Sequence, residues 1–579
     1  MKFTWKIGGE AGFGILTSGL VFSKIVNRLG YFSFDYIEYP SLIRGGHNAL
    51  EVVVSDQEVR ALKKDIDFLL CLNADTYKFH KHRLNTQSYI IYDGDDFKIE
   101  ENIGIKISVP FKKILSELKG PLVMKNTIAM GATLGILGCD LNVLTEILEQ
   151  QFGKKGQEIV DINKRFAQMG YDHVKNSYLQ QIKALLSKKE SEQKLVMSGN
   201  DVFSLASIIA DCRVYCAYPM TPSSTVLTTM ASWQEKTGLV VRHAEDEISV
   251  INTALGATFA GVRAAVGTSG GGFALMVESI SFAGIAEMPI VVFLAQRAGP
   301  ATGMPTWTEQ GDLLFAVHAG HGEFPKIVLS PGDVEEMLEL TTKAFNLTDI
   351  YQTPVIVMSD MLLSESHKSI TKHFIDTLSS HYQVTRGKTV TVTSETKYLR
   401  YKLSDDGISE RLIPGAKGHF YQSNSYEHVE DGHTTEDALA RRQQVEKRNK
   451  KNQTYLMKDF AKPKVYGDIE TANTVFVSWG SNKGPILEAQ KILQENGKTS
   501  AYIHFTHIYP MDREQVTPFL TMNKKYILVE NNSHGQFGKL LLMETGIEIK
   551  DKLLKYDGRP FWPEEIVEKV TSSSSLSSS

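Results

Sequence analysis

Two hydroxyl side chains follow a predicted strand in the middle of the chain. The strand Val214–Ala217 runs into the sequence YPMTPSS, which contains Thr221 and Ser223. Thr221 is predicted to cap a helix whose first residue is Pro222, because proline suits the first helical position and threonine is a good N-cap residue. The pattern is typical of an ordinary capped helix, and equally of hydroxyl groups presented to a ligand at the edge of a sheet.

Three acidic residues follow the next predicted strand, Leu239–Arg242. They are Glu245, Asp246 and Glu247, and they precede a predicted helix rich in alanine and glycine, Ile248–Gly261. Acidic side chains in a first helical turn complement the helix dipole, so they could simply stabilise the helix. A carboxyl group at the start of a closely packed helix could instead share a proton with a ligand nitrogen, which is a catalytic role.

A glycine-rich turn, TSGGG, begins at Thr268, at the end of the predicted strand Ala264–Gly267. Glycines such as Gly270 and Gly271 let the backbone pass close to a ligand, before a helix that is predicted to begin at Phe273. In an open parallel sheet, ligands bind beyond the carboxyl ends of the strands. The turn therefore belongs to the same candidate site as the two segments above.

Three segments of the chain combine short apolar runs with helical periods, which predicts an α/β protein with three parallel-sheet domains. The predicted domains span residues 1–190, 195–370 and 470–570. Residues 371–468 form a polar connecting arm, whose composition fits either a loose linker or an extended arm that wraps a neighbour. The serine-rich end, residues 571–579, is predicted to be disordered.

Composition narrows the classes of function. Hydrophobic residues make up 42% of the 579-residue chain and charged residues 22%, and the net charge is −4. This near balance excludes a strongly basic body built for nucleic-acid binding. No apolar run approaches the roughly 18 residues of a membrane span, and the N-terminus has no export signal, so we expect a cytoplasmic protein. The four cysteines have neither disulfide-scaffold nor metal-site spacing.

A second glycine-rich turn, IGGEAGFG, follows the predicted strand Phe3–Ile7 and opens a helix. Backbone N–H groups at such a helix start can bind an anion. The spacing of Gly9, Gly12 and Gly14 differs from the dinucleotide fingerprint GxGxxG, which weakens the hypothesis of a nicotinamide-linked dehydrogenase. Arg44, in SLIRGGHN, could approach a phosphate or carboxylate, or hold two backbone segments together.

Together, these segments resemble the 2-oxoacid:ferredoxin oxidoreductases, in the form in which a γ domain is fused to the N-terminus of the α subunit. The α-like segments are AYPMTPSS, HAEDEISVINTALGATFAG, GTSGGGFALMVESISFAGIAEMPIVVFLAQRAGPATGMPT and TEQGDLL. IGGEAGFG and SLIRGGHN resemble the γ domain, DGISERLIPG and the basic stretch after it resemble the connecting region, and VENNSHGQFGKLL resembles a C-terminal transketolase-like domain. The resemblance covers nearly the whole chain in order.

The resemblance implies a thiamine diphosphate enzyme that oxidatively decarboxylates a 2-oxoacid to acyl-CoA and CO2 and passes two electrons to ferredoxin. In this family a carboxylic acid activates the cofactor at N1′ of its aminopyrimidine ring. Glu247 matches this acid, with Glu245 as the alternative, and Thr221 matches the threonine that contacts the 2-oxoacid, so Glu247 and Thr221 are expected to be catalytic. The other expected cofactor-binding residues are Tyr218, Thr268, Gly270 and Gly271. Substrate binding is expected of Thr221, Ser223, Arg297 and Trp307.

The other half of such a site is missing from the chain. The Gly-Asp-Gly motif that binds Mg2+ and diphosphate in thiamine diphosphate enzymes does not occur in the sequence, nor do four clustered cysteines for a 4Fe–4S cluster. The resemblance implies a β subunit that carries both. We therefore expect the chain to hold no metal and to be inactive alone. It should work in an (αβ)2 assembly with CoA and ferredoxin, and without nucleic acid or membrane.

One position departs from the family pattern. After GPATGMPT many relatives have a basic residue that would pair with the substrate carboxylate, whereas this chain has Trp307. A neutral indole cannot form that ion pair. Either Arg297, the nearest basic candidate, replaces it, or Trp307 contacts an aryl or branched-chain substrate, or Trp307 is a packed loop residue. A non-catalytic scaffold subunit of the same fold is a further alternative.

Overall fold

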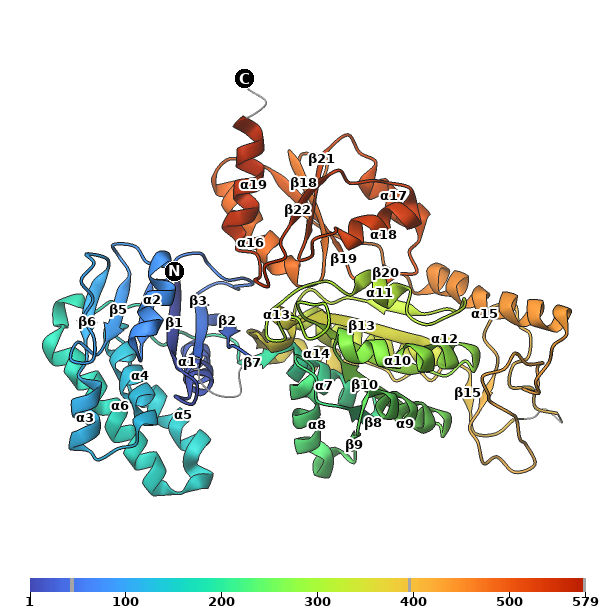
Figure 1. Ribbon diagram of the computed structural model, residues 1–579, viewed down its shortest axis with the longest axis horizontal. Coiled ribbons are helices and arrows are strands. Elements are labelled where there is room, and N and C mark those ends of the chain that lie inside the picture. The colour runs from blue at the N-terminus through green and yellow to red at the C-terminus, as the bar shows by residue number, and fades with distance from the viewer. Residues whose placement is uncertain (42–45, 394–396, 576–579) are drawn as a thin grey trace. The chain divides into compact units, whose positions relative to one another are not determined.

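The computed structural model describes residues 1–41, 46–393 and 397–575, and the chain divides into two compact units (Figure 1). The first unit consists of residues 1–197, 365–376 and 562–568. The second consists of residues 198–364, 377–561 and the part of the chain from 569 on. Each unit is built around its own sheets, and the predicted α/β class is confirmed.

The first unit contains an eight-stranded sheet in the order β6-β5-β4-β1-β3-β2-β14-β7. Strands β1, β4, β5 and β6 are parallel, whereas β3 is antiparallel to both β1 and β2. The sheet is therefore mixed rather than wholly parallel, because the link from β2 to β3 is too short for the crossover that parallel neighbours need. The strands are β1 (Lys2–Glu10), β2 (Phe32–Glu38), β3 (His47–Ser55), β4 (Phe68–Cys71), β5 (Tyr89–Tyr92), β6 (Ile105–Ser108), β7 (Lys194–Ser198) and β14 (His367–Thr371).

Two helices of the first unit pack with their backbones in contact. A Cβ atom at Gly131 of α4 would lie 1.9 Å from the Ala167 carbonyl oxygen of α6, and one at Gly170 would lie 2.0 Å from that of Ile128. Glycine at both positions is what permits this approach. The helices are α1 (Ile15–Arg28), α2 (Ala74–His80), α3 (Phe111–Glu117), α4 (Lys125–Ile136), α5 (Asn142–Phe152) and α6 (Gln157–Ser177).

The second unit contains a seven-stranded sheet in the order β20-β12-β13-β11-β10-β8-β9. All its strands except β20 run parallel, as predicted, so the carboxyl ends of β9, β8, β10 and β11 lie side by side. The strands are β8 (Cys212–Ala217), β9 (Val240–His243), β10 (Arg263–Thr268), β11 (Ile290–Gln296), β12 (Ile327–Leu329), β13 (Pro354–Asp360) and β20 (His507–Tyr509). The helices are α7 (Gly199–Ile209), α8 (Ser224–Thr237), α9 (Glu247–Phe259), α10 (Gly270–Ile285), α11 (Leu313–Val317), α12 (Val334–Tyr351) and α13 (Met361–Glu365).

A five-stranded sheet in the order β17-β19-β18-β21-β22 completes the second unit. Its strands are β17 (Lys464–Tyr466), β18 (Thr474–Trp479), β19 (Ser500–Phe505), β21 (Lys525–Glu530) and β22 (Asp551–Leu554), of which only β17 is antiparallel to its neighbour. Its helices are α16 (Lys483–Glu495), α17 (Arg513–Leu520) and α18 (Gln536–Thr545). The last helix, α19 (Pro563–Ser575), includes residues 571–575, where disorder was predicted, and residues 576–579 lie outside the described chain.

The polar connecting arm folds onto its own chain rather than forming a loose linker. Its elements are α14 (Lys372–His381), β15 (Thr389–Val390), β16 (Arg411–Leu412) and α15 (Ala438–Lys458). In the second unit, the fully buried Glu287 forms ion pairs with Lys447 (2.5 Å) and Lys451 (2.7 Å) of α15. Burial opposes a charge on Glu287, but these ammonium groups hold the pKa of its carboxyl far below the usual range.

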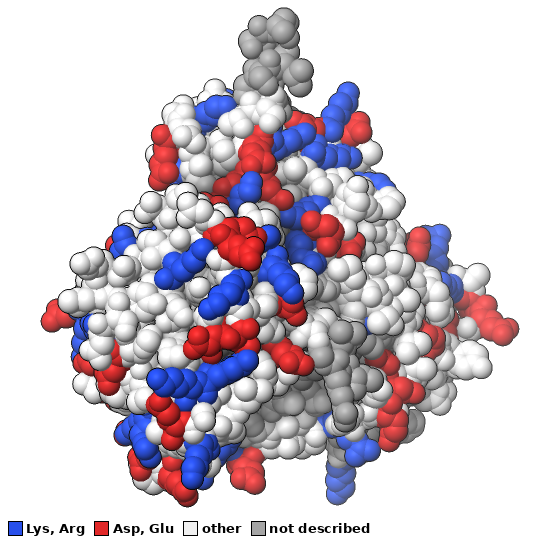
Figure 2. Space-filling model, turned by 60° about the vertical axis from the view of Figure 1, so that its left-hand side comes forward, with Lys and Arg blue, Asp and Glu red and all other residues white. Residues whose placement is uncertain are grey.

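Basic and acidic side chains are interspersed on the face shown in Figure 2. Among the described residues, no helix is long and apolar enough to cross a membrane. In the same residues, no group of three or more His, Cys, Asp or Glu side chains could hold a metal ion.

Candidate active site

The loop after β8 places Thr221 and Ser223 at the carboxyl edge of the parallel sheet. The prediction that Thr221 caps a helix starting at Pro222 is wrong, because the Ser223 N–H and hydroxyl both donate to the Met220 carbonyl (2.9 and 2.8 Å) and close a turn first. Helix α8 begins only at Ser224, and the Thr221–Pro222 peptide bond is cis. Ser223 is buried and Thr221 is half-buried, while Tyr218 of the same loop is 38% exposed.

Two side chains from outside this loop hold it in place: Arg297, which was expected at the same site, and Asn200, which was not. Asn200 of α7 is fully buried, and its Nδ2 atom donates to the Pro222 carbonyl at 2.7 Å. Arg297 donates through Nη1 to the Thr221 carbonyl at 2.9 Å. The backbone at Thr221 and Pro222 is therefore held by two side chains.

Glu247 is the first residue of α9 and is 4% exposed. Asp246 caps the helix by accepting from the Ser249 N–H at 2.7 Å, so Glu247 is not needed as a cap. Its Oε1 atom is buried and has no hydrogen-bond partner within the described chain. A buried carboxyl oxygen without a partner costs free energy and indicates a missing ligand. Glu245, the alternative acid, is exposed.

The glycine-rich turn after β10 makes room for this carboxyl group. Helix α10 begins at Gly270, three residues before the predicted start. A Cβ atom at Gly272 would lie 2.2 Å from Thr268 Oγ1 and 2.5 Å from Glu247 Oε1, whereas one at Gly271 would meet open space. Thr268 and Ser269 are fully buried, and the Ser269 hydroxyl is a second buried polar group without a partner among the described residues.

Two further acids, Glu309 and Asp312, lie in the TEQGDLL segment, and Asp312 interacts with Arg297. A Cβ atom at Gly270 would lie 2.5 Å from Asp312 Oδ2, which places this carboxyl group at the start of α10. Burial raises the pKa of Asp312 to about 6, against the opposing effect of Arg297. Burial and the charge of Asp312 raise the pKa of Glu309 to about 7. The sequence showed both acids, but nothing in it revealed their burial.

Trp307 is covered by an arginine that sequence reasoning missed. The guanidinium carbon of Arg559 lies 3.2 Å from the centre of the Trp307 ring. Arg559 comes from the loop after β22, in the five-stranded sheet of the same unit. No local pattern could link two positions so far apart in the sequence.

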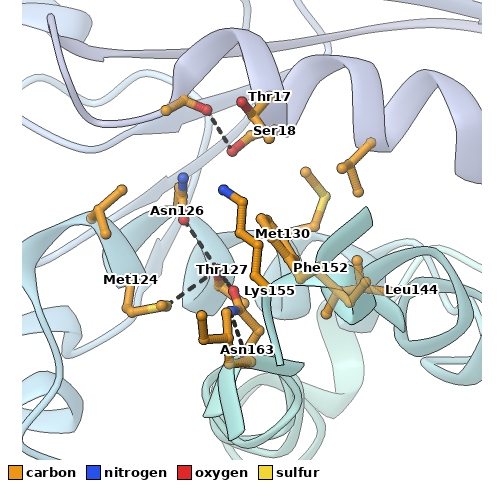
Figure 3. Close-up of a pocket in the computed structure, with 15 residues that line it drawn as sticks. Thr17, Ser18, Met124, Asn126, Thr127, Met130, Leu144, Phe152, Lys155 and Asn163 are labelled. Atoms are coloured by element: carbon orange, nitrogen blue, oxygen red, sulfur yellow. Dashed lines mark hydrogen bonds between the residues drawn. The ribbon is translucent and has the colours of Figure 1, made fainter. Parts of the chain in front are cut away.

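The glycine-rich turn of the first unit lines a separate pocket. Gly14 has left-handed backbone geometry (φ 69°) at the start of α1, and it borders a cavity of about 310 Å3 between α1, α4, α5 and α6 (Figure 3). The walls are mainly apolar, and Lys155 is the one charged residue among those that line it. Gly9 and Gly12 are not among the lining residues, and Arg44 lies outside the described residues. The pocket is amphipathic and lacks the features of a dinucleotide site.

A buried carboxyl oxygen without a partner among the described residues thus lies against a glycine-rich helix start at the carboxyl edge of a parallel sheet, which is where ligands bind in open α/β sheets. Residues 205–448 match the family described as pyruvate flavodoxin/ferredoxin oxidoreductase, thiamine diphosphate-binding. Residues 4–173 match the family described as pyruvate ferredoxin/flavodoxin oxidoreductase.

Full-length relatives identify the family. The chain is 31% identical over 628 residues to a 2-oxoacid:ferredoxin oxidoreductase subunit alpha from Sulfolobus sp., covering 98% of this chain and 96% of that one. It is 28% identical over 378 residues to the 2-oxoglutarate synthase subunit KorA of Methanothermobacter thermautotrophicus, covering 65% of this chain and 98% of that one. A solved 2-oxoglutarate:ferredoxin oxidoreductase from Magnetococcus marinus, with 2-oxoglutarate, coenzyme A and succinyl-CoA bound, superposes with a TM-score of 0.91 at 30% identity and covers 99% of each chain. The chain belongs to the 2-oxoacid:ferredoxin oxidoreductase family, as an α subunit.

Proposed function

We propose that this chain supplies the pyrimidine side of a thiamine diphosphate site shared with a β subunit. The assembly would oxidatively decarboxylate a 2-oxoacid to acyl-CoA and CO2 and pass the electrons to ferredoxin. The observation that carries the proposal is the buried Glu247 carboxyl group, whose Oε1 atom has no partner in the described chain. A ring nitrogen placed there would complete its hydrogen bonding.

When bound, thiamine diphosphate supplies a nucleophilic carbon and an electron sink for decarboxylation. Glu247 would hold a proton at Oε1 and share it with the pyrimidine nitrogen N1′. Gly272 leaves space for that oxygen, because a side chain at this position would displace it. A position beside open space makes Gly271 suitable for close approach of the cofactor, and the exposed ring of Tyr218 suits a contact at a subunit boundary. Thr268 and Gly270 complete the proposed cofactor-binding set.

The substrate would meet the loop after β8. We assign the Thr221 hydroxyl to the carbonyl or carboxylate group of the 2-oxoacid, because Arg297 and Asn200 fix the backbone around it. The Ser223 hydroxyl donates to the Met220 carbonyl, so its role would be to position Thr221 rather than to bind substrate directly. Arg297 would bind the substrate at the same 2-oxo end.

The remaining functions require other chains. All four cysteines are buried free thiols, so none is placed to ligate a cluster at the surface. We infer that a β subunit carries the 4Fe–4S cluster and the Mg2+–diphosphate motif, in an (αβ)2 assembly. Within this chain we propose a γ-like domain at residues 1–190, a pyrimidine-binding domain at 195–370 with its arm at 371–468, and a transketolase-like domain at 470–570.

Substitution of the activating acid tests the proposal. In the assembled complex, Glu247→Gln should lower turnover by about 100-fold or more, the range expected for loss of proton transfer, without changing assembly. Glu245→Gln is the matched control, because this neighbouring acid is exposed. Turnover should be measured as 2-oxoacid-dependent ferredoxin reduction, and assembly by gel filtration. Turnover at the wild-type rate in the Glu247→Gln variant would favour a scaffold subunit and overturn the proposal.

A further inference from the structure

The guanidinium of Arg559 lies over the ring of Trp307 and makes a single hydrogen bond within the described chain. Stacking occupies the face of a guanidinium and leaves its N–H donors, which lie in the plane, directed outward. Within the described chain, the guanidinium makes one long hydrogen bond, from Nη1 to the Asp557 carbonyl at 3.5 Å, and no ion pair. The Asp557 carboxylate instead accepts from the Arg559 backbone N–H at 2.9 Å. Arg559 is therefore a half-buried cation without an anion among the residues that the structure describes.

The backbone holds Arg559 in this position. Its carbonyl accepts from Asn531 Nδ2 at 3.0 Å, and Asn531 is in turn bonded to Gln310, three residues after Trp307. Gly558 has φ 78°, and a Cβ atom there would lie 3.1 Å from both Met304 Cε and Trp307 Cβ. The two partners of the stack are thus fixed by one set of contacts, which lowers the entropic cost of binding a ligand.

A chain of contacts connects this stack to the expected 2-oxo end of the site. The Trp307 carbonyl accepts from the Ala298 N–H at 3.0 Å. The preceding residue, Arg297, reaches the Thr221 carbonyl through Nη1. Arg559 is therefore connected to Thr221 through Trp307, Ala298 and Arg297.

We propose that Arg559, held on Trp307, binds the second, distal carboxylate of a 2-oxodicarboxylic acid. The inference rests on the proposed function and names its substrate class. A planar guanidinium can hold a carboxylate through two parallel N–H donors. The positive charge for the distal carboxylate is thus supplied by Arg559, from the loop after β22 of the five-stranded sheet, and the neutral ring of Trp307 packs against it. The guanidinium covers one face of the indole, so an aromatic substrate tail cannot stack there.

The test compares two substrates that differ only at the far end. The full chain, assembled with its β subunit, is assayed with 2-oxoglutarate and with 2-oxopentanoate, which has the same carbon chain without the distal carboxylate. Arg559→Gln should raise KM for 2-oxoglutarate about tenfold to a hundredfold, the range for losing a charge-assisted hydrogen bond. KM for 2-oxopentanoate and for CoA should not change. Arg559→Lys should give an intermediate KM, and Arg513→Gln, at an exposed arginine of α17, is the matched control.

Three results would overturn the inference. An equal rise in KM for both substrates would assign Arg559 to the first carboxylate, a rise in KM for CoA would assign it to phosphate groups, and no change would leave it without a role. Calorimetric titration of the complex with 2-oxoglutarate, without CoA, measures binding independently of turnover. If wild-type complex oxidises no 2-oxoacid, the proposed function fails. If it does so and Arg559→Gln binds 2-oxoglutarate normally, only the inference fails.

Discussion

Gln310 and Asn531 exchange hydrogen bonds between the two sheets of the second unit. The Gln310 N–H donates to the Asn531 carbonyl at 2.7 Å, and the Asn531 N–H donates to Gln310 Oε1 at 3.1 Å. The same Oε1 atom accepts from Asn482 Nδ2 at 2.7 Å, and Gln310 is fully buried. One side chain thus joins the loop that carries Trp307 to the five-stranded sheet.

Removing the side-chain amide of Gln310 should destabilise the contact between the two sheets of the second unit. Gln310→Leu leaves the donors of Asn482 and Asn531 buried without an acceptor, at a cost of about 1–3 kcal/mol for each unsatisfied group. We expect a lower midpoint of thermal unfolding for the purified chain. Gln453→Leu, on the exposed side of α15, should leave the midpoint close to that of the wild type. Equal stability of the two variants would show that the Gln310 contacts contribute little.

A methyl group at Gly272 should displace the Glu247 carboxyl group from its position in the site. The added Cβ would lie 2.5 Å from Glu247 Oε1, so the carboxyl group must move away from the proposed pyrimidine position. Gly272→Ala should lower both thiamine diphosphate affinity and turnover. The control is Gly256→Ala, within α9, where the new Cβ meets no atom within 4 Å. This variant should keep both thiamine diphosphate affinity and turnover. Equilibrium titration with the cofactor checks the first effect, and normal affinity in Gly272→Ala would contradict this geometry.

The raised pKa values of Glu309 and Asp312 predict a pH dependence of stability. Their pKa values of about 7 and about 6 lie above the ordinary 4.5 and 3.8, so between these values the folded chain binds more protons than the unfolded chain. Their contribution to stability is full at low pH and is lost as pH rises through 6 to 7. The free energy of unfolding should therefore decrease between about pH 5 and pH 8 more in the wild type than in the double variant Glu309→Gln/Asp312→Asn. Parallel curves for the two proteins would be inconsistent with these shifts.

The buried ion pairs of Glu287 should contribute far more to the free energy of unfolding than exposed ion pairs do. Glu287→Gln leaves the buried ammonium groups of Lys447 and Lys451 without their anion, at a cost of about 3–5 kcal/mol. Glu446→Gln removes an exposed pair with Arg442 on the same helix and should cost less than about 0.5 kcal/mol. Denaturant unfolding of both variants measures the difference. A small effect at position 287 would contradict this estimate of the contribution of the buried ion pairs to stability.

Local sequence patterns predicted the parallel sheet of the second unit and the position of Glu247, because apolar runs and helix-start signals act over a few residues. They misplaced the start of α8, since Ser223 bonds back to Met220 and forms a turn first. The antiparallel pairing of β2 with β3 was accessible from the short link between them. The stack of Arg559 on Trp307 was not accessible, because it depends on how two sheets meet. Such contacts are set by packing of the whole unit and leave no signal in a window of ten or twenty residues.

Strand β20 belongs in sequence to the C-terminal third of the chain, yet it forms the outer edge of the seven-stranded sheet by pairing with β12. In a protein truncated before residue 500, β12 would still pair with β13, but its other edge would have no partner. Unpaired backbone groups along a strand edge can pair with another chain. We therefore expect such a fragment to aggregate instead of persisting as an independent module. The C-terminal third therefore also protects the chain from self-association, because its strand β20 covers the edge of β12.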